Sequence, residues 1–370
     1  MWTQNERGSL MSRVKKVFAG GNTTQGFYSF YHNIFDDDAN RVFILKGGPG
    51  TGKSSFMKKI AQQLLILGYD IEEFYCSSDA QSLDGIVVPK LKVAIVDGTA
   101  PHVMDPKYPG CVEEIINLGQ YWDASNLEAE RLEIIRLTKA NSACYPRAYR
   151  YLRAAKCIYE DIQDITKNAM DFGKINRITT NLIQEILGDY TSSLAVGKIR
   201  SLFASGITPQ GPVNELHSIA ENCTRKYILK GEPGTGKSTM ITKIAQRAME
   251  CGLSSEAYHC PIAPESIEHL VIPKLNVAII SSYPPHIYEA DHAIVINLND
   301  CLCQAKRTAF QPTLHKNHIL FEELLDLAFE QLRKAKVIHD QLEDKFTPHM
   351  DFEKINRQND AVLKKILSYA

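Results

Sequence analysis

The same segments occur twice in this chain, in the same order. Residues 44–62 and 228–246 are identical at fourteen of nineteen positions, with an offset of 184 residues. The same offset relates residues 82–102 to residues 266–286. Similarity at a fixed long period indicates an internal duplication. The chain is therefore expected to fold into two related units.

Further matched blocks set the limits of these units. Residues 17–26 match residues 202–211, and residues 170–177 match residues 350–357. We predict two homologous domains, at about residues 9–188 and 189–370, and a length of 370 residues fits two domains of ordinary size. The seam at residues 188–197 is short, so we expect the copies to pack against each other.

The pattern of apolar residues predicts the fold of each copy. Residues 41–46 form an apolar run that ends at a glycine, which is typical of a buried parallel strand. The apolar positions that follow recur at helical spacing up to Gly68, which predicts a helix that ends there. Further strands are predicted at residues 70–76, 92–97 and 114–118. Alternating strands and helices indicate a doubly wound, mostly parallel sheet.

The two ends of each copy differ from this core. We predict a strand near residues 14–21 that leads into a helix near residues 26–35. Residues 127–187 have an apolar period near 3.6, which predicts a helical hairpin or small bundle. The expected fold class is therefore α/β, with two tandem domains that each carry a helical C-terminal extension. The extension is either a packing appendage or a lid.

A glycine-rich loop lies between the first core strand and its helix in both copies. Residues 47–54 and 231–238 each fit the pattern G-x-x-x-x-G-K-[ST]. Glycines let the backbone curl around a phosphate chain and aim several N–H groups at it. Lys53 and Lys237 would reach the β- and γ-phosphates, and Ser54 and Ser238 would offer hydroxyls to Mg²⁺.

These loops define the predicted nucleotide-binding residues of the chain. They are Gly47, Gly48, Pro49, Gly50, Thr51, Gly52, Lys53, Ser54 and Ser55 in the first copy, and Gly231, Glu232, Pro233, Gly234, Thr235, Gly236, Lys237, Ser238 and Thr239 in the second. The sequence resembles the P-loop NTPase superfamily over about twenty residues of each copy, and its G-x-P-G-T-G-K-S form is similar to that of AAA-type ATPases. The resemblance implies binding of ATP and Mg²⁺ and hydrolysis of ATP.

An acidic residue at the end of a neighbouring strand would complete a Mg²⁺ site. Asp97 follows an apolar run, as in the Walker B strands of the superfamily, and would lie by the ion together with Ser54. It could instead start a turn. The corresponding residue in the second copy is Ser281, and Asp79 corresponds to Ala263. We therefore expect the first copy to hydrolyse nucleotide and the second to hold a regulatory or structural one.

Some features of AAA-type enzymes are missing near Asp97. Their Walker B strands end in Asp-Glu, whereas Gly98 follows Asp97 here. Asp105, in a stretch rich in turn residues, is a weak candidate for the general base. His102 and His286 each follow a proline beyond a strand end, where they could contact a ligand or pack a rigid loop.

Positive charge for the phosphoryl transition state could come from the helical extension. Arg147, Arg150 and Arg153 are three residues apart, and only Arg153 has a counterpart, Arg333. We therefore name Arg153, with Lys53 and Asp97, as a candidate catalytic residue. Such side chains could equally cover a solvated surface. Lys156 and Lys336 also correspond.

The composition limits the partners and the compartment. Forty-two Lys and Arg balance forty-three Asp and Glu, so no nucleic-acid partner is expected. No apolar run approaches the roughly 18 residues of a membrane span, and residues 1–16 lack the apolar core of a secretory signal. The nine cysteines show no disulfide framework, which favours a cytoplasmic protein. Cys301, Cys303, His315 and His318 have a loose zinc-like spacing or are ordinary packing residues.

Three functions agree with these observations. The leading hypothesis is a Mg²⁺-dependent ATPase in which occupancy or hydrolysis changes the arrangement of two fused domains. The alternative is a kinase acting on a nucleotide or small metabolite, with Asp79, His102 and the arginines lining an acceptor pocket. The third is an interaction module that binds nucleotide without hydrolysing it. The sequence identifies neither the protein or small-molecule partner nor the oligomeric state.

Overall fold

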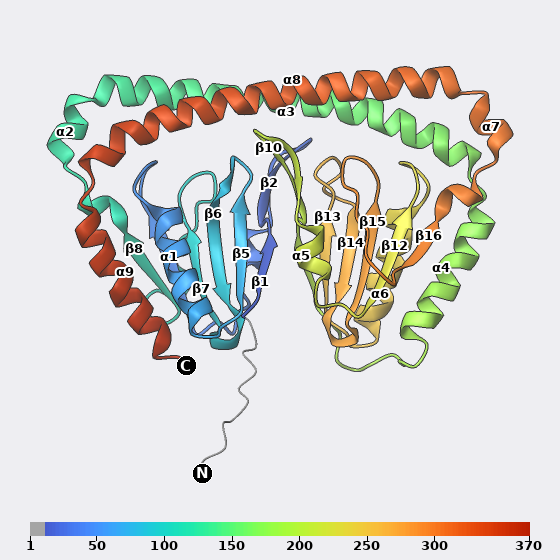
Figure 1. The fold of residues 1–370 in the computed structure, drawn as a ribbon, viewed down its shortest axis with the longest axis horizontal. Coiled ribbons are helices and arrows are strands. Elements are labelled where there is room, and N and C mark those ends of the chain that lie inside the picture. The colour runs from blue at the N-terminus through green and yellow to red at the C-terminus, as the bar shows by residue number, and fades with distance from the viewer. Residues whose placement is uncertain (1–11) are drawn as a thin grey trace, which may run out of the picture.

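The computed structural model describes residues 12–370 and confirms the α/β class (Figure 1). Two six-stranded sheets lie side by side, and a four-stranded sheet connects them. A pair of long helices crosses above both cores, and shorter helices cover their outer sides. The first residues of the predicted first domain, 9–11, and most of the segment searched for a secretory signal lie outside the described residues.

The first core has the strand order β1-β5-β6-β7-β4-β8. Its strands are β1 (Val14–Val17), β4 (Arg41–Lys46), β5 (Ile71–Cys76), β6 (Asp79–Val88), β7 (Val93–Asp97) and β8 (Glu113–Asn117). Strand β6 is antiparallel to both neighbours, whereas the remaining pairs are parallel. The sheet is therefore mixed. The strands predicted at 70–76, 92–97 and 114–118 are confirmed within one residue, whereas β6 had no sequence prediction.

The second core repeats this arrangement, with the order β9-β13-β14-β15-β12-β16. Its strands are β9 (Ile199–Leu202), β12 (Arg225–Lys230), β13 (Ser255–His259), β14 (Ile267–Ile272), β15 (Val277–Ser282) and β16 (Ile294–Asn297). Helix α1 (Lys53–Ile66) packs on the first sheet and α6 (Lys237–Glu250) on the second, each by the apolar stripe that the spacing predicted. Buried residues of both copies also share one apolar cluster, so the cores pack together.

The helix predicted near residues 26–35 is wrong. This segment forms β3 (Gly26–Ser29), which pairs with β2 (Gly20–Thr23), followed only by the short 3-10 helix η1 (Tyr31–Asn33). Gly26 has a φ of +100° at the turn, and the Thr23 hydroxyl donates to its carbonyl at 2.8 Å. In the second copy, β10 (Ser205–Thr208) and β11 (Gly211–Asn214) precede the short helix α5 (Leu216–Ala220). Pairing of β2 with β10 joins the two hairpins.

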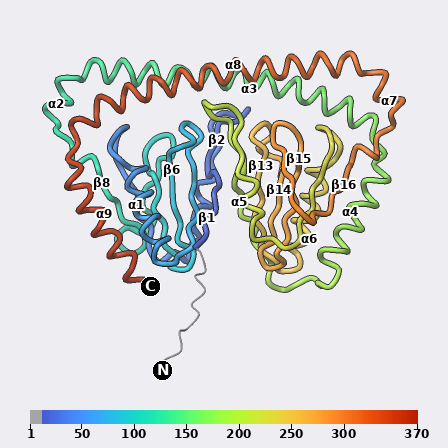
Figure 2. Tube along the Cα trace, viewed as in Figure 1, coloured from blue at the N-terminus to red at the C-terminus, as the bar shows by residue number. Residues whose placement is uncertain are grey.

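The extensions are helical, but they do not fold back as hairpins on their own copies. They comprise α2 (Ala124–Ala129), α3 (Arg131–Ala169) and α4 (Phe172–Leu187), and then α7 (Gln304–Thr308), α8 (Gln311–Phe346) and α9 (Phe352–Leu367), with short 3-10 turns between several elements. Helices α3 and α8 lie against each other and run in opposite directions across both cores (Figures 1 and 2). At about 1.5 Å per residue, the 39 residues of α3 are long enough to reach the other core.

Each extension therefore completes the core of the other copy. Ile175, Leu182 and Ile186 of α4 belong to the buried cluster around β12 and α6. Ile355, Val362 and Ile366 of α9 belong to the cluster around β4 and α1. The boundary near residue 188 separates the sequence repeats, while α4 packs on the second core. Every helix within residues 12–370 is too short or too polar to cross a membrane.

Candidate functional site

Glycine loop 1, residues 47–54, connects the buried strand β4 to the first turn of α1. Gly50 and Gly52 have φ of +69° and +84°, which glycine adopts without the strain of a side chain. The Lys53 ammonium folds back over the loop and donates to the carbonyls of Gly47 and Gly48 at 2.9 and 3.0 Å. Its Nζ also lies 3.6 Å from Oδ2 of Asp97. The Lys53 ammonium makes the loop electrostatically positive, and the unpaired amides at the start of α1 add to that positive potential.

Glycine loop 2, residues 231–238, repeats the geometry between β12 and α6. Gly234 and Gly236 have φ of +90° and +93°. Lys237 Nζ donates to the carbonyls of Gly231 and Glu232, the latter at 2.9 Å. Burial lowers the pKa of Lys237 to about 8, against the attraction of the Glu268 carboxylate. Both loops thus hold a lysine over a curled backbone at a helix N-terminus.

Each loop lines a cavity that the helices of the other copy help to close. The cavity at glycine loop 1 has a volume of about 430 Å³, and its lining includes Lys336, His339 and Glu343 near the C-terminal end of α8 and Thr347 just after it. The cavity at glycine loop 2 has a volume of about 410 Å³, and its lining includes Tyr159, Gln163 and Lys167 of α3 and Phe172 of α4. All predicted loop residues from Pro49 to Ser55 and from Pro233 to Thr239 line these two cavities.

The covering helices come close to the loop backbones. A Cβ on Gly50 would lie 2.9 Å from the carbonyl oxygen of Glu343, and one on Gly234 would lie 2.3 Å from that of Gln163. These positions therefore exclude side chains for two reasons, since their φ values are positive as well. The close approach makes each loop sensitive to the placement of the other copy's helix.

The structure places Ser54 and Asp97 in one cavity, as the sequence predicted for a Mg²⁺ pair. Asp97 ends β7, and its Oδ1 accepts from the Thr99 amide at 2.8 Å. Burial raises the pKa of Asp97, while Lys53 and Thr99 oppose that shift. The Ser54 hydroxyl accepts from the Leu83 amide at 3.0 Å. A hydroxyl and a carboxylate are oxygen donors of the kind that Mg²⁺ prefers, so these residues fit the ion.

The surroundings of glycine loop 2 lack these carboxylates. Ser281 and Ala263 line its cavity where Asp97 and Asp79 line the first. The Ser281 amide donates to Nδ1 of His269 at 3.1 Å. Ser238 lines this cavity. The residue that would bind Mg²⁺ together with Ser238 is Ser281, which offers a neutral hydroxyl in place of the Asp97 carboxylate.

Sequence reasoning missed a second acidic residue at each loop. Asp84 of β6 lines the cavity at glycine loop 1, and Glu268 of β14 lines the one at glycine loop 2. Asp84 Oδ2 lies 3.3 Å from Nε2 of His102, whose ring stacks on Tyr31. Burial raises the pKa of Glu268 to about 7. The signal was present, because both carboxylates stand at the same position of the matched blocks 82–102 and 266–286.

A second hollow adjoins glycine loop 1, with a volume of about 690 Å³. It shares Lys53, Asp84 and Asp97 with the first cavity. Its lining is largely apolar and includes the aromatic or aliphatic residues Phe27, Tyr145, Tyr149, Leu342 and Phe346, together with His102. Glycine loop 1 and its acidic residues therefore lie between two hollows of different character.

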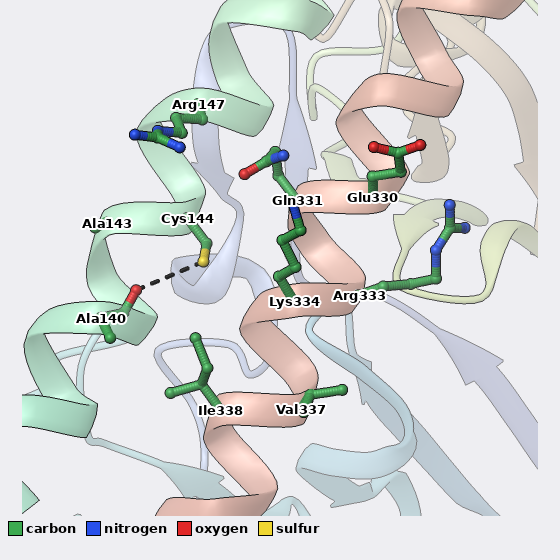
Figure 3. A pocket seen from close by; sticks show the side chains of 10 residues that line it. All are labelled: Ala140, Ala143, Cys144, Arg147, Glu330, Gln331, Arg333, Lys334, Val337 and Ile338. Carbon is green, nitrogen blue, oxygen red and sulfur yellow. Dashed lines mark hydrogen bonds between the residues drawn. The ribbon is translucent and has the colours of Figure 1, made fainter.

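The other candidates lie elsewhere. Arg153 is exposed on α3 and is not among the residues that line the cavity at either loop. Arg147 and Arg333 line an outer groove of about 610 Å³ between α3 and α8, shown in Figure 3. Lys336 does reach the first cavity, with Nζ 3.7 Å from Oδ2 of Asp79, whereas Lys156 pairs with a glutamate.

Neither the loose zinc-like set nor the candidate base joins a site. Cys301 is buried below α4, and His315 and His318 lie on the first turns of α8. Within residues 12–370, they form no group of close potential ligands with Cys303. Asp105 is exposed and pairs with Lys46 at 3.3 Å. His286 is partly buried in the loop after β15, and this burial lowers its pKa to about 4.

Comparison of the chain with protein-family models, with curated proteins and with solved structures found no match. Two glycine loops each hold a lysine at a helix N-terminus. Only the first loop has an acidic residue, Asp97, at the end of the neighbouring strand, because Ser281 stands at that position in the second copy. Such an arrangement suits a phosphate-rich anion and its counter-ion.

Proposed function

We propose that the chain is a P-loop NTPase that binds Mg²⁺ and ATP at glycine loop 1 and hydrolyses the nucleotide there. The position of Lys53 supports this proposal most directly. Its side chain folds over the loop at the start of α1 and lies 3.6 Å from Asp97. A phosphate chain in the loop would replace the two carbonyl partners of Lys53 by phosphate oxygens, and the loop amides would surround it.

The residues of this chain divide the work at the proposed site. Backbone amides of the loop and Lys53 bind and orient the triphosphate, and Ser54 with Asp97 holds the ion. Bound Mg²⁺ supplies charge neutralisation and a fixed orientation of the phosphates. The end of α8 and the residue after it cover one side of the loop, because Glu343 and Thr347 lie against Gly50, and such cover would keep water from that side of a bound phosphate.

For glycine loop 2 we propose nucleotide binding with slow or no hydrolysis. Lys237 and the loop backbone match those of the first copy, whereas Ser281 and Ala263 replace the flanking carboxylates. Occupancy of this loop would act on the first site through α3 and α8, which each touch both cores. Such a site is regulatory. The nine unpaired cysteines support a cytoplasmic location for this activity.

A second candidate function is phosphoryl transfer to a small acceptor. The aromatic hollow beside glycine loop 1 favours it, since Lys53, Asp84 and Asp97 line that hollow as well as the cavity at the loop. ATP in one hollow and an acceptor in the other would place the acceptor next to the transferred phosphate. A kinase would release ADP in proportion to the acceptor, whereas an ATPase would not.

The test is calorimetric binding of ATP with Mg²⁺, followed by ADP release with and without a panel of nucleosides, nucleotides and sugars. Binding with acceptor-independent turnover supports the ATPase, and acceptor-dependent turnover supports the kinase. Binding without turnover under any condition would leave a nucleotide-dependent interaction module and contradict both enzymes. No heat of association with any nucleoside triphosphate would overturn the proposal as a whole.

A further inference from the structure

We propose that Cys76, Asp84 and His102 form a binding site for a divalent transition metal of the zinc class. The Cys76 sulfur, a carboxylate oxygen of Asp84 and a ring nitrogen of His102 all lie within 4.8 Å of one another. Asp84 and His102 are 5% and 8% exposed, and Cys76 is half-buried. The three come from β5, β6 and the loop after β7, so the fold brings them together from separate segments.

The donor set selects the class of ion. Thiolate and imidazole are ligands of Zn²⁺ and similar ions, whereas Mg²⁺ prefers oxygen donors. Ligand atoms around a tetrahedral zinc lie about 3.5 Å apart, given bonds of about 2.0–2.3 Å. The three atoms lie within 4.8 Å of one another, and Nε2 of His102 is 3.3 Å from Oδ2 of Asp84, so modest side-chain movement would bring them to the spacing of a formed site. This ion is separate from the Mg²⁺ proposed beside Ser54 and Asp97.

The buried polar atoms of the cluster lack hydrogen bonds. Among the described residues, Oδ2 of Asp84 and Nδ1 of His102 have no hydrogen-bond partner, and the only basic side chain within 4 Å of the Asp84 carboxylate is His102, at 3.3 Å. Unsatisfied buried polar atoms are costly and rare in native proteins. A bound cation would satisfy the carboxylate, and it would also balance the second carboxylate, Asp97, across the same cavity.

The second copy offers a comparison inside the same chain. Cys260, Glu268 and His286 stand at the corresponding sequence positions. Here, however, His269 replaces Gly85 and its Nε2 lies 3.6 Å from the Glu268 carboxylate. Within residues 12–370, the three do not form a group of close ligands as their counterparts do. The duplication therefore retains the residue types, while the geometry for a metal is found in the first copy.

Three protein ligands leave a fourth tetrahedral position for an exchangeable ligand. Cys76 and Asp84 line both hollows at glycine loop 1, and His102 lines the aromatic one. The free position would face that space and take a water or an oxygen of a small bound molecule. The inference does not rest on the proposed function, because its test uses the metal alone, with no nucleotide present.

Cobalt provides the spectroscopic test. The full chain would be stripped with a chelator, reloaded with Co²⁺ and examined for a thiolate-to-cobalt charge-transfer band and the intense visible bands of tetrahedral cobalt. We expect both, with displacement by Zn²⁺. Cys76→Ser should lose the charge-transfer band, whereas the matched variant Cys260→Ser should keep it. No thiolate band in the unaltered chain, or an unchanged band in Cys76→Ser, would overturn the site.

A protection experiment needs no substitution and so decides the matter if Cys76→Ser does not fold. Zn²⁺ should slow alkylation of Cys76 by about tenfold or more, since the thiolate is both the nucleophile and the metal ligand, so that the metal competes with the reagent for the sulfur. The exposed Cys111 should react at the same rate with and without the metal. Equal alkylation of Cys76 in both conditions, measured by mass spectrometry of the peptides, would contradict the proposal.

Discussion

The two glycine loops are alike in themselves and different in what surrounds them. In both, a lysine donates to two loop carbonyls, and a matched pair of glycines has φ between +69° and +93°, Gly50 and Gly52 in one loop and Gly234 and Gly236 in the other. Around glycine loop 1, Asp97 lies beside Lys53, and Lys336 points into the cavity. Around glycine loop 2, the position of Asp97 holds Ser281. This difference is the basis of our proposal that both copies bind phosphate and that only the first carries out chemistry on it.

The loops also depend on each other through the helices. The end of α8 closes the cavity of the first copy, and the end of α3 closes that of the second. Helices α3 and α8 also lie against each other, so they connect the surroundings of the two loops. The two loops therefore differ in their neighbouring acidic residues but share one pair of covering helices.

The largest expected effect is a difference in ATP turnover between variants of Lys53 and of Lys237. Lys53→Ala should lower ATP turnover by about a hundredfold to a thousandfold, the usual loss when one group that stabilises the transition state is removed. Lys237→Ala should weaken nucleotide binding or its regulatory effect and leave most of the maximal turnover. Steady-state kinetics with calorimetry on both variants checks this. Equal loss of turnover from the two substitutions, with both proteins folded, would abolish the proposed division of labour.

A smaller effect is expected at the residues that differ between the copies. Asp97→Asn should lower Mg²⁺-dependent turnover by about tenfold to a hundredfold, because the amide is a weaker partner for a metal and for its water ligands. Ser281→Ala, the matched variant, should change turnover little. A Mg²⁺ titration of the rate would detect the change. Unaltered hydrolysis by Asp97→Asn would remove that residue from the metal site.

Much of each core could be predicted from local pattern. Helix α1 begins at Lys53, where the glycine loop ends, and β5 and β7 fall within a residue of their predicted limits. These elements are specified by their own apolar periodicity and by the glycines that bound them. Strand β6 was not predicted, because it begins with Asp79 and three further polar or small residues and its apolar residues come later.

The exchange of helices between the copies could not be predicted from the same pattern. Helices α4 and α9 begin with nearly identical segments, at residues 170–177 and 350–357, and the two cores present related surfaces. The amphipathic pattern predicts that such a helix buries one face. It does not predict which of the two similar cores the helix packs on. Helices α3 and α8 line the cavities, and Cys76 lies close to His102, only because the fold brings distant segments together. The spacing of residues along the sequence does not predict such contacts.

The buried lysine of the second copy should respond to pH. Its pKa of about 8 means that Lys237 is charged below that pH and neutral above it. ATP affinity at glycine loop 2 should therefore fall above about pH 8, by at most about tenfold per pH unit. Calorimetry in the Lys53→Ala background, between about pH 7 and pH 9, isolates this loop. A constant affinity over the range would show that the Lys237 charge does not set binding.

The mildest change tests the crossed helices themselves. Ile186 of α4 and Ile366 of α9 are matched residues, buried against the second and the first core respectively. Ile→Val at either position should cost about 1 kcal/mol of folding free energy, the usual loss of one buried methylene. Hydrogen exchange should then rise in α6 for Ile186→Val and in α1 for Ile366→Val, each in the opposite copy. Faster exchange in the helix of the same copy would mean that the extensions pack on their own cores.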